Sequence, residues 1–470
     1  MAGKISDLPD EILSFILLFL TMKEAARTGI LSRRWKSVWK TSVSSSPSIC
    51  LDVLTMRGSD YPKEFFGDYM SIQHHGGSIL LERRKFVKFA DQILQLDHRP
   101  VKDLFKLRFY LRKDYAHHID RWIKMAIAKR CQKFDIDLSH VHTMGKYYQQ
   151  DEDLYMFPIT LFTKETGSSV KCLSLKSCIF KSHDINIFSS LIDLQLEYVL
   201  IDKASIVSIL CNCLNLEYLF IGSCQRLLGL EICGPSLKLK HMTVLFCHDL
   251  KKIKIEANKL TRLQYSGNPV KFVFLKVPQL SNVIIRTERG RSCGALSYAL
   301  GKLSSDLPKL KSLILSVVPL EEKKIPRQLP LFTNLRKLVL SVSTRGGTLW
   351  GFIPLLQASP YLRKLELHLS VWVHEHETGL MEMPSDSPHV HLKEIMLSGF
   401  FGRPHDIEFT TYLLKNATTL KRISIFYWNL TYGHATDFWG GGSTKKVEKL
   451  AAKTTKETKE DGKCLEAPSK

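Results

Sequence analysis

The chain has 470 residues, 44% of them hydrophobic, and a formal net charge of +21. This length is too great for a single ordinary core and indicates several domains or a repeat array. The surplus of lysine and arginine would attract acidic surfaces of any kind, nucleic acid included, and identifies none of them. The eleven cysteines contain no Cys-X-X-Cys spacing, which argues against a zinc site and favours reduced structural thiols.

A very apolar helix is predicted in the segment LPDEILSFILLFL at residues 8–20. Asp7 as N-cap, Pro9 in the first turn and the acidic pair Asp10 and Glu11 favour a helix start. The apolar run is too short for a membrane span, which needs about 20 residues. The acidic residues before it do not fit a secretory signal. Because its apolar side chains point in every direction, the helix must be covered on every side.

From residue 170 onward a short pattern recurs: an apolar residue, two variable residues, an apolar residue, one variable residue and an apolar residue. Looser copies precede it at residues 104 and 131. The main copies begin 20 to 30 residues apart, at residues 170, 191, 216, 239, 260, 280, 310, 335, 362, 392 and 420. This interval is typical of leucine-rich repeats.

The pattern predicts a parallel sheet covered by helices. Alternate residues of a strand point to opposite faces, so the two closely spaced apolar residues face a core shared by neighbouring repeats. Between strands, residues 203–215 place Ile206, Ile209, Leu210 and Cys213 at helical spacing. The predicted fold class is therefore α/β: a small helical unit at the N-terminus, followed by a solenoid with a curved parallel sheet whose concave face is free to bind.

Residues between the apolar strand positions should line that concave face. From residue 170 onward only Lys176 and Arg286 are basic there, so the face does not suit a phosphate backbone. Several members are apolar, which a solvated sheet face seldom allows, although covering loops would explain half of them equally well. The predicted target-binding residues are Phe220, Leu245, Ile284, Arg286, Ile314, Val339, His368, Met396 and Phe426.

Residues 5–40 resemble an F-box; their sequence is ISDLPDEILSFILLFLTMKEAARTGILSRRWKSVWK. The resemblance lies in the opening Leu8-Pro9, the Ile-Leu helix and the closing LSRRWKSVW. Thr21 departs from the plant-type pattern, which usually has proline there. Residues 391–425 resemble the FBD region that closes many plant F-box proteins with leucine-rich repeats. The two end regions and the repeats between them cover most of residues 5–428.

The resemblance implies a substrate adaptor of an SCF-type ubiquitin ligase. Its F-box would dock on a Skp-type adaptor, which links it to a cullin and a RING protein and covers the apolar helix. The residues expected to bind the adaptor are Leu8, Pro9, Ile12, Leu13, Ile16, Leu31 and Trp35. The sequence does not separate those that face the adaptor from those that pack on their own helices.

The predicted domains are an F-box at 1–45, a linker with irregular first repeats at 46–169, repeats at 170–390, FBD-like terminal repeats at 391–428 and a polar, lysine-rich, disordered tail at 440–470. No catalytic residue, metal site, cofactor or membrane partner is predicted, and the target protein is not identified. The expected location is the nucleus, the cytoplasm or both.

Other motifs are weak. The segment GGGSTKK at 440–446 lacks the spacing of a phosphate loop, and HEHE at 374–377 lacks a third metal ligand. Nucleophile elbow, HExxH and dinucleotide patterns are absent from the sequence. Three alternatives to a ligase adaptor remain: a basic solenoid that binds nucleic acid, a non-degradative interaction scaffold, and a solenoid that holds a small ligand.

Overall fold

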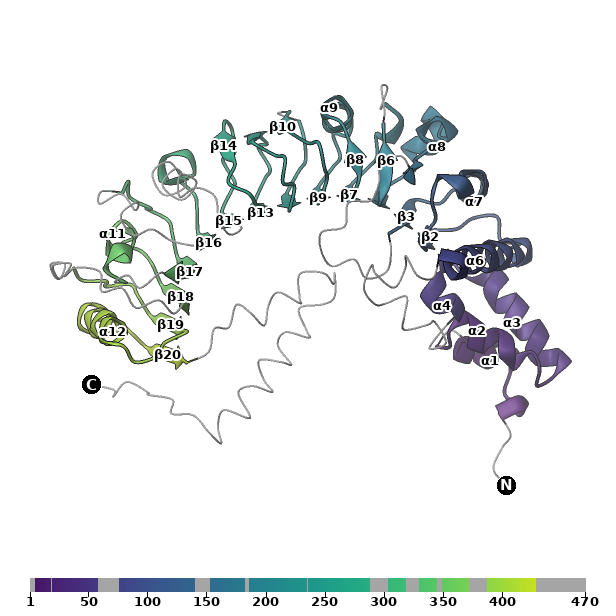
Figure 1. The fold of residues 1–470 in the computed structure, drawn as a ribbon, viewed down its shortest axis with the longest axis horizontal. Coiled ribbons are helices and arrows are strands. Elements are labelled where there is room, and N and C mark those ends of the chain that lie inside the picture. The colour runs from purple at the N-terminus through teal and green to yellow at the C-terminus, as the bar shows by residue number, and fades with distance from the viewer. Residues whose placement is uncertain are drawn as a thin grey trace. The chain divides into compact units, whose positions relative to one another are not determined.

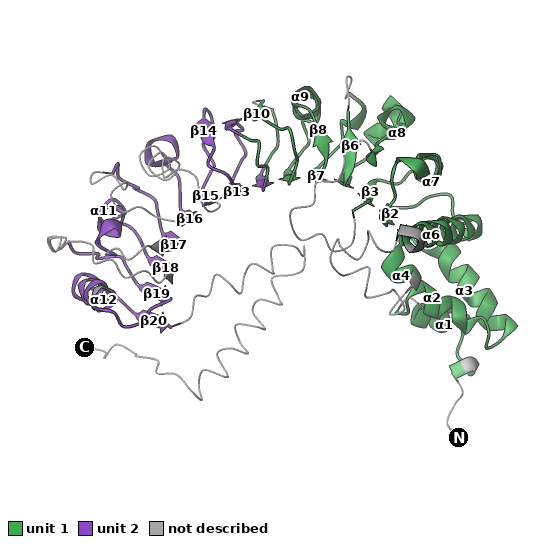
Figure 2. Cartoon of the chain, viewed as in Figure 1, with its two compact units in different colours: residues 1–239, 247–250 green, residues 240–246, 251–470 purple. Residues whose placement is uncertain are grey.

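The computed structural model describes residues 5–17, 19–57, 76–139, 153–181, 186–234, 236–287, 303–317, 329–344, 349–371 and 387–427. The chain divides into two compact units, which are considered separately (Figures 1 and 2). Unit 1 holds residues 1–239 and 247–250, and unit 2 holds residues 240–246 and 251–470. The GGGSTKK and HEHE motifs and the predicted tail lie outside the described residues.

Unit 1 begins with a small helical bundle. A 3-10 turn, η1 (Ile5–Asp7), precedes α1 (Asp10–Leu17), α2 (Met22–Thr28) and α3 (Arg33–Ser45). Their shared core consists of Leu13, Leu17, Ala25, Trp35 and Val38, with Ile16 and Trp39 packed at its edge. So few core side chains provide little stabilisation, because small units bury only a modest fraction of their surface.

The capping of these helices differs from the prediction in one place. Helix α1 begins at Asp10, so Asp7 ends the preceding 3-10 turn and is not the N-cap of the helix. Thr21 takes a role that the sequence did not predict, because its hydroxyl accepts from the Glu24 amide while the Glu24 carboxylate accepts from the Thr21 amide. This capping box fixes the start of α2 at the position where proline was expected.

The rest of unit 1 forms parallel strands with helices and turns between them. The strands β1 (Ser48–Asp52), β2 (Leu104–Arg108), β3 (Lys133–Asp137), β5 (Cys172–Lys176), β7 (Asp193–Glu197) and β9 (Tyr218–Gly222) pair in that order. A second ladder joins β4 (Tyr155–Met156), β6 (Cys178–Phe180) and β8 (Leu200–Ile201). The remaining strand of unit 1 is β10 (Gly229–Cys233).

Helices and turns connect these strands. They are α4 (Val53–Arg57), α6 (Gly76–Leu96), η4 (Lys113–Tyr115), α7 (Ala116–Ala128), η6 (Ile159–Leu161), α8 (Lys164–Ser168), η7 (Asn186–Phe188) and α9 (Lys203–Asn212). The predicted helical spacing after residue 203 is confirmed, since α9 buries Ile206, Ile209 and Leu210, and Cys213 is buried just beyond it.

Unit 2 continues the same plan. Its main ladder is parallel and joins β11 (His241–Leu245), β13 (Arg262–Gly267), β15 (Asn282–Thr287), β16 (Ser312–Val317), β17 (Lys337–Thr344), β18 (Lys364–Val371), β19 (Glu394–Ser398) and β20 (Arg422–Phe426). A separate pair joins β12 (Lys252–Glu256) to β14 (Lys271–Phe274). The connecting elements are η9 (Leu349–Phe352), α11 (Ile353–Gln357) and α12 (Pro404–Asn416).

Every repeat buries the two residues that the pattern predicted, for example Leu313 with Leu315 and Leu365 with Leu367; only Ile425 in β20 remains half-buried. Because register partners align across neighbouring strands, these side chains form continuous apolar rows. The predicted α/β fold class, a helical unit followed by repeat-built parallel strands, is confirmed.

Two early repeats differ from the prediction. Strand β1 is a copy that the sequence did not reveal. The copy assigned to residue 104 is out of register, since Phe105 and Leu107 pair with Phe134 and Ile136 and the copy therefore starts at Lys102. Lysine in the first apolar position hid the true register.

A tight turn after β19 requires glycine. Gly399 has φ +74°, and a Cβ there would lie 1.9 Å from the Leu369 carbonyl oxygen. An L-residue is disfavoured at this φ in any case. The turn directs the chain from β19 towards α12.

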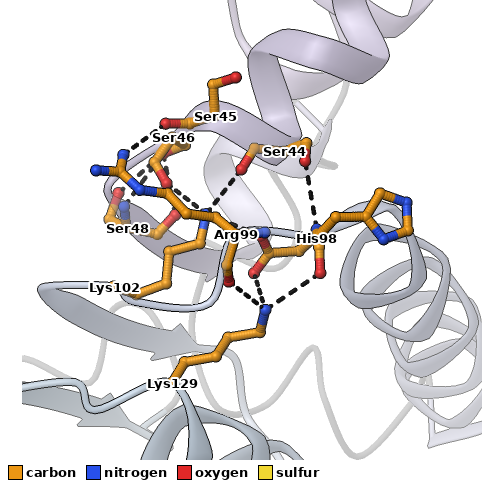
Figure 3. A network of polar contacts seen from close by, with 9 residues as sticks. Ser44, Ser45, Ser46, Ser48, His98, Arg99, Lys102 and Lys129 are labelled. Atoms are coloured by element: carbon orange, nitrogen blue, oxygen red, sulfur yellow. Dashed lines mark hydrogen bonds and ion pairs between the residues drawn. The ribbon is translucent and has the colours of Figure 1, made fainter.

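A buried polar cluster joins the helical bundle to the first repeats (Figure 3). Lys102 and Asp97 form an ion pair at 2.8 Å, with side chains only 1% and 5% exposed. The Lys102 ammonium also donates to the carbonyl oxygens of Ser44, at 3.1 Å, and Ser46 at the end of α3. Lysine therefore replaces an apolar residue here because it can satisfy the exposed carbonyls of a helix end.

The same cluster includes the end of α7. Lys129 lies 3.3 Å from Asp97 and donates to the carbonyl oxygens of Asp97 and Arg99. Arg99 in turn donates to the Ser45 carbonyl at 2.9 Å. Three segments of unit 1 are thus held together by charge-assisted hydrogen bonds, which are stronger than neutral ones.

Candidate interaction surfaces

The helical bundle exposes large apolar side chains. Helix α1 turns Leu13 and Leu17 into the core, whereas Ile12 and Phe15 lie on its outer side at helical spacing and are 46% and 59% exposed. Phe19 packs edge-on against Phe15 with ring centroids 5.1 Å apart. A small bundle of a single protein rarely exposes so many large apolar side chains, and such exposure is a feature of interaction sites. The exposed apolar residues of this surface are Leu8, Ile12, Phe15, Phe19, Leu20, Ile30 and Leu31.

The seven residues predicted to bind an adaptor fall into two groups. Leu8, Pro9, Ile12 and Leu31 are exposed, and Ile16 is half-buried. Leu13 and Trp35 are fully enclosed in the core of the bundle. Their side chains therefore support the surface from beneath and do not form part of it.

Phe15, Phe19 and Ile30 also belong to this surface, although they were not among the predicted residues. Phe19 and Ile30 are 76% and 86% exposed. For Phe15 a signal was available: it follows Ile12 by three residues, on the side opposite Leu13 and Leu17. The sequence pattern did not show which side of α1 is buried, because both sides of the helix are equally hydrophobic.

Arg34 fixes the beginning of α3 to the beginning of α1. Its Nε donates to Asp10 at 2.8 Å, and its Nη2 donates to the Leu8 carbonyl at 2.6 Å. These bonds hold the segment before α1 in place, and with it the exposed Leu8 and Pro9.

A second candidate surface is the outward side of the unit 2 sheet. Register aligns Ile284, Ile314, Val339, Glu366 and Met396 in one row. The next row contains Leu245, Ser266, Arg286, Ser316, Ser341, His368, Ser398 and Phe426. The structure thus brings the eight predicted target-binding residues of unit 2 into two adjacent rows.

The side chains of these predicted residues are less exposed than those on an uncovered sheet face would be. Leu245, Val339 and His368 are buried, and the other members of the prediction are half-buried. Burial raises the energetic cost of charging Arg286 and lowers its pKa. Phe220 lies in unit 1, where it aligns with Gln195.

The corresponding face in unit 1 carries charges of alternating sign. Asp52, Arg108, Asp137, Lys176 and Glu197 occupy one register row. Arg108 lies 3.7 Å from Asp52 and 3.6 Å from Asp137, and Lys176 lies 3.1 Å from Glu197. The charges of this row compensate one another, so the row is a poor track for phosphates.

Glu366, His368 and Ser398 form a polar group within the unit 2 rows. His368 Nδ1 lies 2.7 Å from Ser398 Oγ, and His368 Nε2 lies 3.9 Å from Glu366. Although Ser, His and an acid also form hydrolase triads, Ser398 is 0% exposed and no substrate can reach it. The group is therefore a structural cluster of polar side chains.

Within the described residues, no set of three or more His, Cys, Asp and Glu side chains is placed to hold a metal ion. None of the described helices is long and apolar enough to cross a membrane. The nine described cysteines are all free thiols.

Comparisons with known proteins agree with this architecture. Residues 5–44 match the F-box domain, and residues 98–459 match the family described as At1g61320/AtMIF1, LRR domain. F-box/FBD/LRR-repeat protein At2g04230 of Arabidopsis thaliana is 27% identical, over 89% of this chain and 88% of that protein. F-box/FBD/LRR-repeat protein At4g26340, also of Arabidopsis thaliana, is 26% identical over 89% and 91%. FBD-associated F-box protein At4g10400 of the same plant is 26% identical over 90% and 92%.

The fold defines the class: a small helical bundle followed by leucine-rich repeats. The chain belongs to the plant F-box proteins with a leucine-rich-repeat domain. The resemblance inferred from residues 5–40 and from the repeats is confirmed.

Proposed function

We propose that the chain is the substrate-recognition subunit of an SCF-type ubiquitin ligase. Its F-box binds a Skp-type adaptor, and through it a cullin and a RING protein, while the repeats bind a target protein for ubiquitination. The chain itself catalyses no reaction and needs no cofactor. It raises the local concentration of the target near the ubiquitin-charged enzyme.

The observation that carries this proposal is the exposed apolar surface around α1. Burying one large apolar side chain contributes roughly 1.5–3 kcal/mol, so a partner that covered Ile12, Phe15 and Leu31 would gain substantial affinity. The small core of the bundle fits the same role, since a partner would add apolar contacts that the bundle lacks by itself. The free cysteines suit a reducing compartment, and we propose the nucleus, the cytoplasm or both.

For the target, we propose the two register rows of unit 2, with Ile284, Ile314 and Met396 as half-buried apolar contacts. The compensated charges of unit 1 do not favour a nucleic-acid partner on the unit 1 sheet. We propose a protein target.

The adaptor interface can be tested with the full-length chain and a purified Skp-type adaptor. Ile12→Ser with Phe15→Ser should weaken binding by more than about 100-fold, because two apolar side chains together contribute about 3 kcal/mol or more. Isothermal titration calorimetry measures the loss.

Helix α12 provides a matched control, since Ile407 and Leu414 are two similarly exposed apolar residues on one helix. Ile407→Ser with Leu414→Ser should leave adaptor binding unchanged. If the wild-type chain does not bind the adaptor, or if both double variants lose binding equally, the proposal is wrong.

A further inference from the structure

A row of cations crosses five consecutive repeats of unit 2. Lys311, Arg336, Arg363, Lys393 and Lys421 each directly precede a strand, β16, β17, β18, β19 and β20 respectively. They are direct neighbours, because the backbone N–H of each of the last four donates to the carbonyl of the preceding member at 2.8–2.9 Å. We call these five residues the cation row.

The row lies at the amino-terminal edge of the unit 2 sheet and is accessible. Four members are exposed and Arg336 is half-buried. Neighbouring strands are about 4.8 Å apart, so five cations follow one another over about 19 Å. Like charges placed opposite one another on adjacent strands destabilise a sheet.

No carboxylate among the described residues forms an ion pair with any member of the row. The next residues along the chain are different. Lys337 lies 3.0 Å from Glu366, and Lys364 lies 3.1 Å from Glu366 and 3.6 Å from Glu394. The same sheet edge therefore pairs Lys337 and Lys364 with carboxylates, whereas the cation row has no carboxylate partner among the described residues.

The row is also limited to the later repeats. The same series of backbone hydrogen bonds continues from Lys311 to Ser281, Thr261 and Lys240. The earlier strands of unit 2 therefore contribute a single cation. Five successive cations are thus a local feature of β16 to β20 and not a general property of the repeats.

We propose that the cation row binds an acidic segment of the target protein, a role that rests on the proposed function and specifies the chemistry of the target. The row borders the strands whose outward side chains we assign to the target. An extended acidic segment lying across the strand entrances would pair with the row while the rest of the target contacts the two register rows. Such complementary charges increase association rates and select partners.

Two features favour a polypeptide over nucleic acid. Glu394 follows Lys393 directly and its side chain is 49% exposed, which would repel a continuous phosphate backbone but can be avoided by separately placed acidic side chains. Tyr361, the aromatic residue nearest the row in sequence, is already stacked on His391 and lies under the Arg336 guanidinium at 5.8 Å. It is therefore less available for base stacking.

The test uses the full-length chain and a fluorescein-labelled 15-residue peptide with glutamate at alternate positions. Fluorescence anisotropy at 50 mM salt should show binding that weakens as salt increases. Arg363→Gln with Lys393→Gln should weaken binding at least tenfold, and the charge-preserving pair Arg363→Lys with Lys393→Arg should restore most of it.

The matched control removes two cations elsewhere in unit 2. Lys252 and Lys271 are register partners on β12 and β14, and both are exposed. Lys252→Gln with Lys271→Gln should weaken peptide binding less than threefold. Equal losses in the two double variants would show only a general charge effect and would overturn the proposal.

Two further results would also overturn it. One is the absence of peptide binding by the wild-type chain. The other is a single-stranded DNA of equal charge that binds at least tenfold more tightly than the peptide and loses affinity in the row variant. Adaptor binding is measured on the same preparations, so a failure of the cation row can be distinguished from a failure of the proposed ligase role.

Discussion

Glu366 shows at the residue scale how the unit 2 sheet holds a charge. Burial alone would raise the pKa of its carboxyl, but the nearby side chains of His368, Lys337 and Lys364 outweigh that effect and lower the pKa to about 2. A carboxyl whose pKa is lower in the folded state stabilises the fold above its unfolded pKa, near 4.5. That stabilisation is lost as the pH falls towards 2.

We therefore predict a pH-dependent cost for Glu366→Gln. The variant should be about 2–3 kcal/mol less stable than wild type at pH 7, and the difference should shrink between pH 4.5 and pH 2. Urea unfolding at a series of pH values measures it. A difference that stays constant down to pH 2 would contradict the assigned ion pairs.

At the element scale, the ends of α3, α6 and α7 meet at the buried pair of Lys102 and Asp97. Removing one partner of a buried ion pair usually costs about 3–5 kcal/mol, because the other charge stays buried. Lys129 still neutralises part of the Asp97 charge, so we expect Lys102→Met to destabilise the chain by about 3 kcal/mol.

Replacing both partners should be less harmful. Lys102→Met with Asp97→Met removes both charges of the pair but takes the carboxylate from Lys129, whose side chain is 14% exposed, so we expect it to recover part of the stability lost in the single variant. Chemical denaturation of the four chains of this double-mutant cycle provides the measurement. A double variant that is less stable than Lys102→Met would refute this explanation of the cluster.

Lys102 also shows why part of the fold could not be predicted from the sequence. The repeats after residue 170 were recognisable because alternation places apolar residues at fixed positions. Lys102 occupies such a position with a charge, and Ser46 precedes β1 at the equivalent place. Ser46 caps the end of α3, and Lys102 donates to the carbonyl oxygens of Ser44 and Ser46. The residue type at these two positions therefore follows from contact with the helix end and not from the repeat core.

The candidate sites were predictable to a similar extent. Alternation correctly grouped the outward residues of unit 2, since rows follow directly from strand register. Their burial did not follow, because the exposure of Val339 or His368 depends on neighbours far along the chain. The division of α1 into Leu13 inside and Phe15 outside likewise depends on where α3 packs.

At the scale of the whole molecule, the position of charge matters more than its total. The outward row of unit 1 is internally compensated, whereas the cation row of unit 2 is not. The two rows occupy different positions of the repeat, since the unit 1 row lies at the last residue of each strand and the cation row lies directly before each strand. The net charge of +21 therefore did not identify a partner, and the edge of one sheet suggests an acidic one.

The cysteines allow a test that covers the chain as a whole. Five of the nine described cysteines are buried: Cys131, Cys178, Cys213, Cys224 and Cys247. Burial raises the pKa of Cys131, Cys178 and Cys213 to about 12. Since the thiolate is the reactive form, these thiols should resist alkylation at pH 7.5 while the exposed Cys211 reacts.

Peptide mapping after brief iodoacetamide treatment measures this pattern. Among the nine described cysteines, we expect Cys211 to be labelled first in the native chain and the five buried thiols to be labelled only in denaturant. In denaturant, all eleven cysteines should be alkylated without a reductant. Early labelling of Cys178 or Cys213 would show that the repeat core opens readily. A disulfide-linked peptide would contradict the reduced framework on which the proposed nuclear or cytoplasmic location depends.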